Sequence, residues 1–126
     1  EKDQMMASWE VEYTNEFEEW WDLQTAEAQV DIGIVVGLLE KLGPHLGFPY
    51  SSGVTTSKHS HMRELRIQHK GAPFRLLYAF DPKRIAVILL GGCKDGDDRW
   101  YDVSVPLADK LYDEHISTLI KETKNG

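Results

Sequence analysis

The stretch that decides the fold is MRELRIQHKGAPFRLLYAFDPKRIAVILLGGCKDGDDRWY, which spans residues 62–101. It predicts three β-strands over 62–69, 74–80 and 84–90, because apolar and polar side chains alternate and turn residues separate the runs. The segments 70–73 and 81–83 have hairpin length, so neighbouring strands are expected to run antiparallel. The third run is apolar on both faces, which predicts an interior strand.

Alternation also divides the side chains of these strands between two sheet faces. Leu65 and Ile67 are expected on one face, and Arg66 is expected on the other. In the next strand the aromatic side chains share one face, and Arg75 lies opposite them. The face without the aromatic side chains is therefore predicted to form a groove that carries Arg66 and Arg75.

The residues before the three strands predict one further strand and two helices. Residues 9–13 alternate apolar and acidic side chains, as a half-buried strand does. Asn15, three residues before Glu18, is expected to cap a helix, and a second helix is expected to begin near Thr25. Whether the two helices form an antiparallel hairpin or one bent helix stays open. The expected core face of the second helix is Val30, Ile34, Leu38 and Leu42.

The remaining segments complete a β-α-α-β-β-β-α order. Residues 43–61, rich in Gly, Pro, Ser and Thr, are expected to form the longest loop. Pro106 is expected to open a last helix that runs to about Lys121. We therefore expect one α+β domain over 1–126, with a small, mostly antiparallel sheet and helices packed mainly on one face. Residues 1–8 are interpreted as a frayed leader or a cloning remnant.

Charge is distributed unevenly along the chain. The whole chain has 14 Lys and Arg against 21 Asp and Glu, a net charge of −7. Residues 58–99 nonetheless carry nine basic and five acidic side chains, whereas residues 1–57 carry two and eleven. A net −7 disfavours non-specific nucleic-acid binding by the molecule as a whole. A local basic surface can still attract an anion.

Cysteine usage and hydropathy exclude several classes of protein. Cys93 is the single cysteine, so the chain has neither a disulfide framework nor a cysteine zinc site. No apolar run approaches the roughly 20 residues needed to cross a bilayer. A cytoplasmic protein without membrane association is expected. Cys93 is interpreted as a small buried residue rather than as a nucleophile.

Two groups of side chains suggest phosphate or RNA chemistry. Guanidinium groups bind phosphate bidentately, and an ammonium stabilises charge on a transferring phosphoryl group. The segment 99–101 adds one charge and two rings on which unstacked bases can stack. The alternative is that the arginines only solubilise the sheet, paired with Glu64 or Asp81, and that the rings pack on it. The basic group is Arg63, Arg66, Arg75, Lys94 and Arg99.

His59 and His61 form a His-x-His pair. Such a pair can ligate zinc or act as a general base near neutral pH. No third ligand is apparent, so no metal site is predicted. The two histidines could act in acid–base catalysis or could simply be exposed to solvent, and the sequence leaves both interpretations open. The acidic run at 95–98 is only superficially similar to a calcium loop, because it lacks the downstream bidentate Glu.

The motif RELR at 63–66, followed by RLLYAFDP at 75–82, resembles the RelE/ParE toxin superfamily and specifically its HigB-like, phage-derived branch. The resemblance covers about residues 9–120. It implies a RelE-like fold and a small cytosolic toxin encoded beside an antitoxin, usually a helix-turn-helix, HigA-like protein. It implies the ribosome and mRNA as further partners and no cofactor; a homodimer stays open.

The resemblance also implies a reaction. HigB-like and RelE-like members cleave mRNA on the ribosome without a metal, the ribose 2′-OH attacking the adjacent phosphate, whereas ParE-like members poison DNA gyrase. Carried over by position, Arg66 and Arg75 would grip phosphate and Lys94 would stabilise the transition state. The implied catalytic set is Arg75, Lys94, Arg99, Tyr101 and His61. The implied RNA-binding set is Arg63, Arg66, Lys70, Trp100 and His59.

The chain departs from the family pattern after the third strand. Lys94 is followed by Asp95, Gly96, Asp97 and Asp98, which places three carboxylates where phosphate must approach. These carboxylates either turn away, or tune proton transfer, or mark a lost activity. A gyrase poison and a non-catalytic binding domain on the same scaffold therefore remain as alternatives to an mRNA nuclease.

Overall fold

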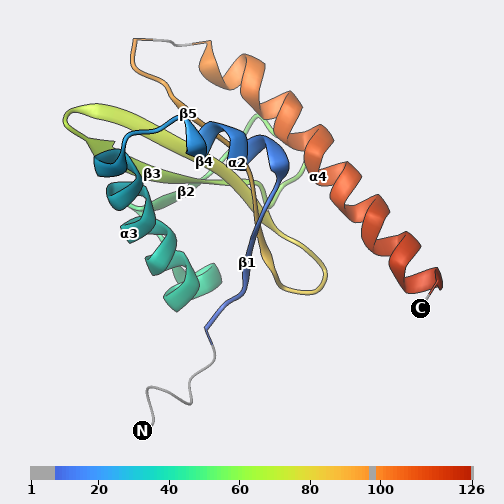
Figure 1. Cartoon of the computed structure of the whole chain (residues 1–126). Coiled ribbons are helices and arrows are strands. Elements are labelled where there is room, and N and C mark those ends of the chain that lie inside the picture. Colours follow the sequence, from blue (N-terminus) through green and yellow to red (C-terminus); the bar gives the residue numbers. More distant parts are fainter. Residues whose placement is uncertain (1–7, 97–98, 126) are drawn as a thin grey trace, which may run out of the picture.

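The computed structural model describes residues 8–96 and 99–125, so the interpretation of residues 1–7 lies outside the described residues. One five-stranded sheet has the order β1-β5-β4-β3-β2 and is accompanied by three α-helices (Figure 1). The elements are β1 Val11–Tyr13, α2 Asn15–Asp22, α3 Ala26–Leu42, the short 3-10 helix η1 Gly43–His45, β2 Ser51–Gly53, β3 Arg63–His69, β4 Ala72–Phe80, β5 Ala86–Cys93 and α4 Trp100–Asn125. The predicted α+β fold is confirmed.

The three predicted strands form the antiparallel meander β3-β4-β5. β5 is interior as predicted, because it pairs with β4 on one side and, in parallel, with β1 on the other. Leu77 pairs with Leu90 and Tyr78 pairs with Ile88, so Leu89 is an extra residue in β5. Such a bulge strengthens the local twist of a sheet.

Helices cover both faces of this sheet (Figure 1). α2 and α3 share one face, where Phe17, Ile32 and Leu39 form one core cluster with side chains of β3, β4 and β5. α4 lies on the opposite face, where Val105 and Ala108 belong to a second cluster. Two of the three α-helices thus share a face. The third covers part of the face that was expected to be an open groove, because β5 is apolar on both sides.

The start of α2 differs from the prediction by one residue. Thr14, rather than Asn15, is the cap: its hydroxyl accepts a hydrogen bond from the Phe17 N–H at 3.0 Å and donates to the Leu89 carbonyl at 2.7 Å. The second hydrogen bond joins the cap residue to β5, which explains why Thr14 and not Asn15 caps the helix. α3 begins after Thr25 as predicted, and the two helices are separate.

Two further boundaries were predicted wrongly. α4 begins at Trp100, so Pro106 lies inside the helix instead of opening it. Residues 51–53, inside the expected long loop, form β2 by pairing with β3. The sequence of β2 is Ser-Ser-Gly, which has low strand propensity, so the pairing comes from the neighbouring strand and not from the residues themselves.

α3 turns a different face to the core from the one predicted. The buried side chains are Ala28, Ile32, Val35, Val36 and Leu39. Val30 and Ile34 are instead 62% and 60% exposed. α3 is apolar on most of its circumference, so two stripes satisfy the helical period, and periodicity alone does not say which one is buried.

Two glycines near the end of β5 each leave room for a tryptophan ring, one on each face of the sheet. A Cβ atom on Gly91 would lie 2.4 Å from Cε3 of Trp20, and a Cβ atom on Gly92 would lie 2.4 Å from Nε1 of Trp100. Both distances are far inside van der Waals contact, so glycine is required at both positions. The predicted third strand ended at residue 90, directly before these glycines, and this end is wrong, because β5 continues through both glycines to Cys93.

We predict that Gly91→Ala lowers the free energy of unfolding by about 1–3 kcal/mol, because the new methyl group overlaps the Trp20 ring. Gly47→Ala is the matched control, since open space surrounds that position. Urea denaturation of both variants tests this. Equal midpoints for the two variants would show that Trp20 does not rest on Gly91.

Candidate functional site

Glu64 is the centre of a charged cluster on the α4 face of the sheet. Its side chain is almost fully buried, and Oε1 accepts a hydrogen bond from the Tyr101 hydroxyl at 2.7 Å. Oε2 accepts from Ser52 Oγ at 2.9 Å and from Arg66 Nη1 at 3.1 Å. β2, β3 and α4 therefore meet at one carboxylate.

Arg75 lies beside Glu64 and opposite Arg66 in the register of β3 and β4. It is only 5% exposed, with its Nε 3.8 Å from Glu64 Oε1 and its Nη1 donating to the Phe74 carbonyl at 2.9 Å. Arg75 Nε has no hydrogen-bond acceptor among the described residues. A buried donor without an acceptor is costly. The cluster therefore holds an unused cationic N–H next to a carboxylate.

Lys94, Trp100 and Tyr101 complete the cluster. Lys94 Nζ lies 5.8 Å from the centroid of the Tyr101 ring, and the Trp100 ring meets that ring edge-on at 5.1 Å. Burial raises the pKa of the Tyr101 hydroxyl, the hydrogen bond to Glu64 raises it further, and Arg75 opposes the shift. Tyr101 is therefore a protonated hydrogen-bond donor at neutral pH.

The structure thus brings together Arg66, Arg75, Lys94, Trp100 and Tyr101, which were singled out from the sequence. Arg99 directly precedes α4, and its side chain is exposed. Asp95 is exposed as well. The predicted acidic turn 95–98 falls partly outside the described residues, because these do not include Asp97 and Asp98.

The other basic candidates lie away from the cluster. Arg63 alternates onto the α3 face, where its Nε donates to Ser51 Oγ at 3.0 Å. Lys70 forms an exposed ion pair with Glu27 of α3 at 2.6 Å. These two side chains therefore stabilise the fold locally and do not join Glu64.

The two histidines contact the middle of α4. His59 Nε2 lies 2.9 Å from Asp113 Oδ1, and His61 Nε2 lies 3.1 Å from the Tyr112 hydroxyl. Tyr112 is eleven positions beyond Tyr101 in α4. At about 1.5 Å per residue, that is roughly 16 Å along the helix axis. The histidine pair holds its loop against α4, away from the charged cluster.

Glu64 is the residue that sequence reasoning missed as a site residue. The sequence offered a signal, since alternation along the strand places Glu64 on the same sheet face as Arg66. The sequence also suggested that Glu64 pairs with the arginines of the sheet, and the contacts of Glu64 with Arg66 and Arg75 show this pairing. Asp81 instead accepts two turn N–H groups and contacts His115 at 2.8 Å.

Cys93 is exposed, so its interpretation as a buried residue is wrong. The reason is that β5 runs three residues past the predicted end at residue 90, and Cys93 is its last residue. Among residues 8–96 and 99–125, no group of three or more His, Cys, Asp or Glu is arranged to hold a metal ion. No helix in the same part of the chain combines the length and apolarity that crossing a membrane needs.

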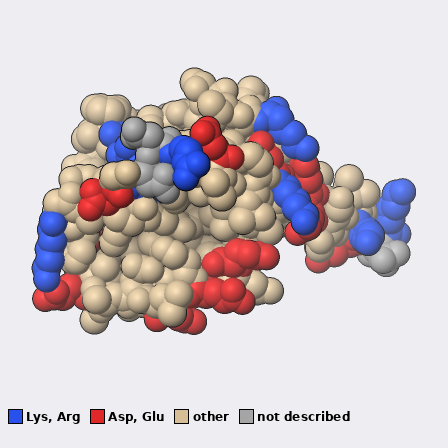
Figure 2. All heavy atoms as spheres, turned by 90° about the horizontal axis from the view of Figure 1, so that it is seen from above, with Lys and Arg blue, Asp and Glu red and all other residues tan. Residues whose placement is uncertain are grey.

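Figure 2 shows how the charges are arranged on the side of the molecule that lies uppermost in Figure 1. Lys and Arg groups lie apart from one another there, with Asp and Glu groups between them (Figure 2). The local excess of basic residues in 58–99 therefore does not produce one continuous basic surface on this face. Any anion would have to be bound by a few specific side chains.

Known proteins resemble this chain over most of its length. Residues 19–113 match the family described as "Phage derived protein Gp49-like (DUF891)". The chain is 41% identical over 102 residues to "Putative toxin HigB3" of Mycobacterium tuberculosis (strain ATCC 25618 / H37Rv), over 80% of this chain and 88% of that protein. It is 40% identical over 84 residues to "Putative toxin HigB2" of the same strain, over 65% of this chain and 42% of that protein.

We predict that Glu64→Gln lowers the free energy of unfolding by about 2 kcal/mol or more, because it leaves the charge of Arg75 buried without its carboxylate. Glu27→Gln is the matched control, since it removes an exposed ion pair worth about 0.5 kcal/mol or less. Urea denaturation measures both. Equal losses would mean that the buried carboxylate does not hold the cluster together.

Proposed function

Since this chain belongs to the phage-derived Gp49-like family, the HigB-like branch of the RelE/ParE superfamily, we propose that it is the toxin of a toxin–antitoxin pair and cleaves mRNA on the ribosome. The names of the two relatives support the toxin role. The proposed partners are a cognate helix-turn-helix antitoxin and the translating ribosome, and the proposed location is the cytoplasm.

The observation that carries the nuclease proposal is the cluster of cationic and phenolic donors around Glu64. In the proposed reaction the ribose 2′-oxygen forms a bond to the adjacent phosphorus while the bond from phosphorus to the 5′-oxygen breaks. A base takes the proton of the 2′-OH and an acid protonates the leaving 5′-oxygen. The products carry a 2′,3′-cyclic phosphate and a free 5′-OH.

Each proposed role follows from how a side chain is held. Lys94 is half-exposed and carries no carboxylate contact among the described residues, so it is the cation best placed to stabilise charge on the phosphate. Tyr101 is protonated and serves as the donor to the leaving oxygen. The unused Nε of Arg75 offers a further N–H. Arg66 and the exposed Arg99 would hold the flanking phosphates.

The geometry argues for a different base from the one expected. His61 lies roughly 16 Å along α4 from Tyr101, which is too far for both to act on one phosphate. When a phosphate replaces Glu64 as the acceptor for Tyr101 and Arg66, the released carboxylate is the proton acceptor beside the 2′-OH. Glu64 is therefore the proposed base.

A second candidate is a ParE-like toxin that binds gyrase, or a non-catalytic binding domain. The observation that favours it is that Arg66 and Arg75 already contact a buried carboxylate, which reduces their attraction for phosphate. Such a protein would act through its surface, and its charged cluster would only hold α4 against the sheet.

We predict growth arrest on induced expression, with new mRNA 5′-ends phased within codons and bearing 5′-OH groups. Lys94→Ala should reduce cleavage about tenfold or more, because it removes a cation from the transition state. Lys110→Ala, an exposed lysine further along α4, is the matched control and should leave cleavage unchanged. Mapping of 5′-ends after arrest, with thermal unfolding of each variant, measures the effect.

The other outcomes separate the candidates. Arrest with double-strand DNA breaks and intact mRNA would replace the nuclease with a gyrase-type toxin. No arrest, in a chain that is folded and expressed, would leave a binding domain. Equal cleavage by Lys94→Ala and Lys110→Ala would support a nuclease whose active site does not include Lys94 and lies outside this cluster.

A further inference from the structure

α3 carries an apolar stripe that the described residues do not bury. Val30 and Ile34 lie one turn apart and are 62% and 60% exposed, although the opposite stripe of the helix forms the core. A helix that is apolar on all sides is normally covered on all sides. Among the described residues nothing covers this stripe, so it is available to a partner surface.

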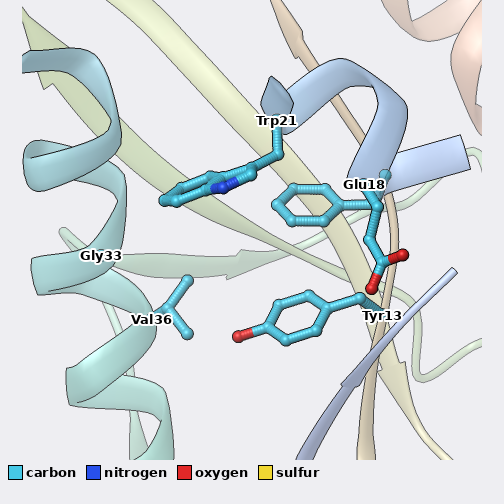
Figure 3. Close-up of a pocket in the computed structure, with 6 residues that line it drawn as sticks. Tyr13, Glu18, Trp21, Gly33 and Val36 are labelled. Atoms are coloured by element: carbon cyan, nitrogen blue, oxygen red, sulfur yellow. The ribbon is translucent and has the colours of Figure 1, made fainter. Parts of the chain in front are cut away.

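A cavity of about 300 Å³ opens beside this stripe, between β1, α2 and α3. Tyr13, Trp21 and Val36 point toward one another across it, and Glu18 lies at its rim (Figure 3). Phe17 lines it as well and stacks on Tyr13 at 5.3 Å. This volume suits one or two large apolar side chains, so the cavity can receive an anchor residue from a partner.

Two glycines join the cavity to the exposed stripe. At 100° per residue, Gly33 and Gly37 lie on α3 between Val36 and the pair of Val30 and Ile34. Gly33 also lines the cavity, and a Cβ atom at either glycine would meet no atom within 4 Å. The backbone of α3 is therefore open to close approach along this line. Cavity, glycines and stripe form one surface, named here the α3 groove.

The surroundings of the α3 groove are acidic. Residues 15–42 contain seven Asp and Glu and one basic residue, Lys41. Burial raises the pKa of the Tyr13 hydroxyl, and the nearby carboxylates of Glu40 and Glu18 raise it further; Glu18 also lines the cavity. Neither takes part in an ion pair between described residues. A second copy of this chain would bring like charges together, whereas a basic partner would neutralise them.

We propose that the α3 groove binds a basic amphipathic helix of the antitoxin, with apolar side chains against Val30, Ile34 and the cavity and Lys or Arg residues beside Glu18 and Glu40. The identity of the partner rests on the proposed function. The α3 groove lies on the opposite sheet face from the Glu64 cluster, so this helix binds without occupying the proposed nuclease site.

The test uses the full-length chain and the purified protein encoded by the neighbouring gene. Ile34→Arg should weaken their binding about 30-fold or more in titration calorimetry, because it places a cation in an apolar contact that faces a basic helix. Ile120→Arg is the matched control, since Ile120 is a similarly exposed isoleucine on α4. Glu18→Gln/Glu40→Gln should also weaken binding and flatten its dependence on salt.

Growth assays separate this inference from the proposed function. Cells that express Ile34→Arg should still arrest but should no longer be rescued by the neighbouring gene, whereas Ile120→Arg should be rescued like the wild type. If both variants are rescued equally and bind with equal affinity, the α3 groove is not the binding site, although the toxin role still stands. A wild-type dimer that Ile34→Arg dissociates would also overturn it, because a second copy would then cover the stripe. Absence of arrest would reject the toxin role. Calorimetry would still show whether the partner binds at the α3 groove.

Discussion

The structure depends on one constraint, a strand that is apolar on both faces and must be covered on both. β5 satisfies it by placing α2 and α3 on one side and α4 on the other. Gly91 and Gly92 then let Trp20 and Trp100 rest against the strand from opposite faces. Because Trp100 is the first residue of α4, this contact positions Tyr101 over Glu64. The candidate site is therefore a consequence of how the sheet is covered.

The Glu64 cluster stabilises the fold and also contains the side chains proposed for catalysis. A buried carboxylate with two arginines and a tyrosine around it is stable only while each member has its partners. A phosphate that enters would supply new acceptors for Tyr101 and Arg66 and would release Glu64. The buried Nε of Arg75 has no hydrogen-bond acceptor among the described residues, so the arrangement does not satisfy every donor of the cluster.

Much of the fold could be predicted from local pattern, and the errors have physical causes. Alternation and hairpin turns determine the meander β3-β4-β5, because each is set by residues a few positions apart. The pairing of β2, the cap at Thr14 and the buried stripe of α3 depend on neighbours that are distant in sequence. For the site, residue type identified the cations and Tyr101. It could not show that Glu64 binds them, or that His61 is held on another part of α4, since both are tertiary contacts.

The net charge of −7 is less of an objection to RNA binding than the sequence suggests, because the two most acidic helices lie on one face of the sheet. The helices α2 and α3, which carry seven of the acidic residues, cover the face opposite Glu64, Arg66 and Arg75. The α3 groove, whose carboxylates a basic partner would neutralise, therefore lies on the other sheet face from the proposed substrate site. The acidic face would then serve recognition of the partner, and the opposite face would serve the substrate. One sheet can separate these functions because β5, apolar on both sides, is covered by helices on both faces, and α4, with five carboxylates and three lysines, is less acidic than α2 and α3 together.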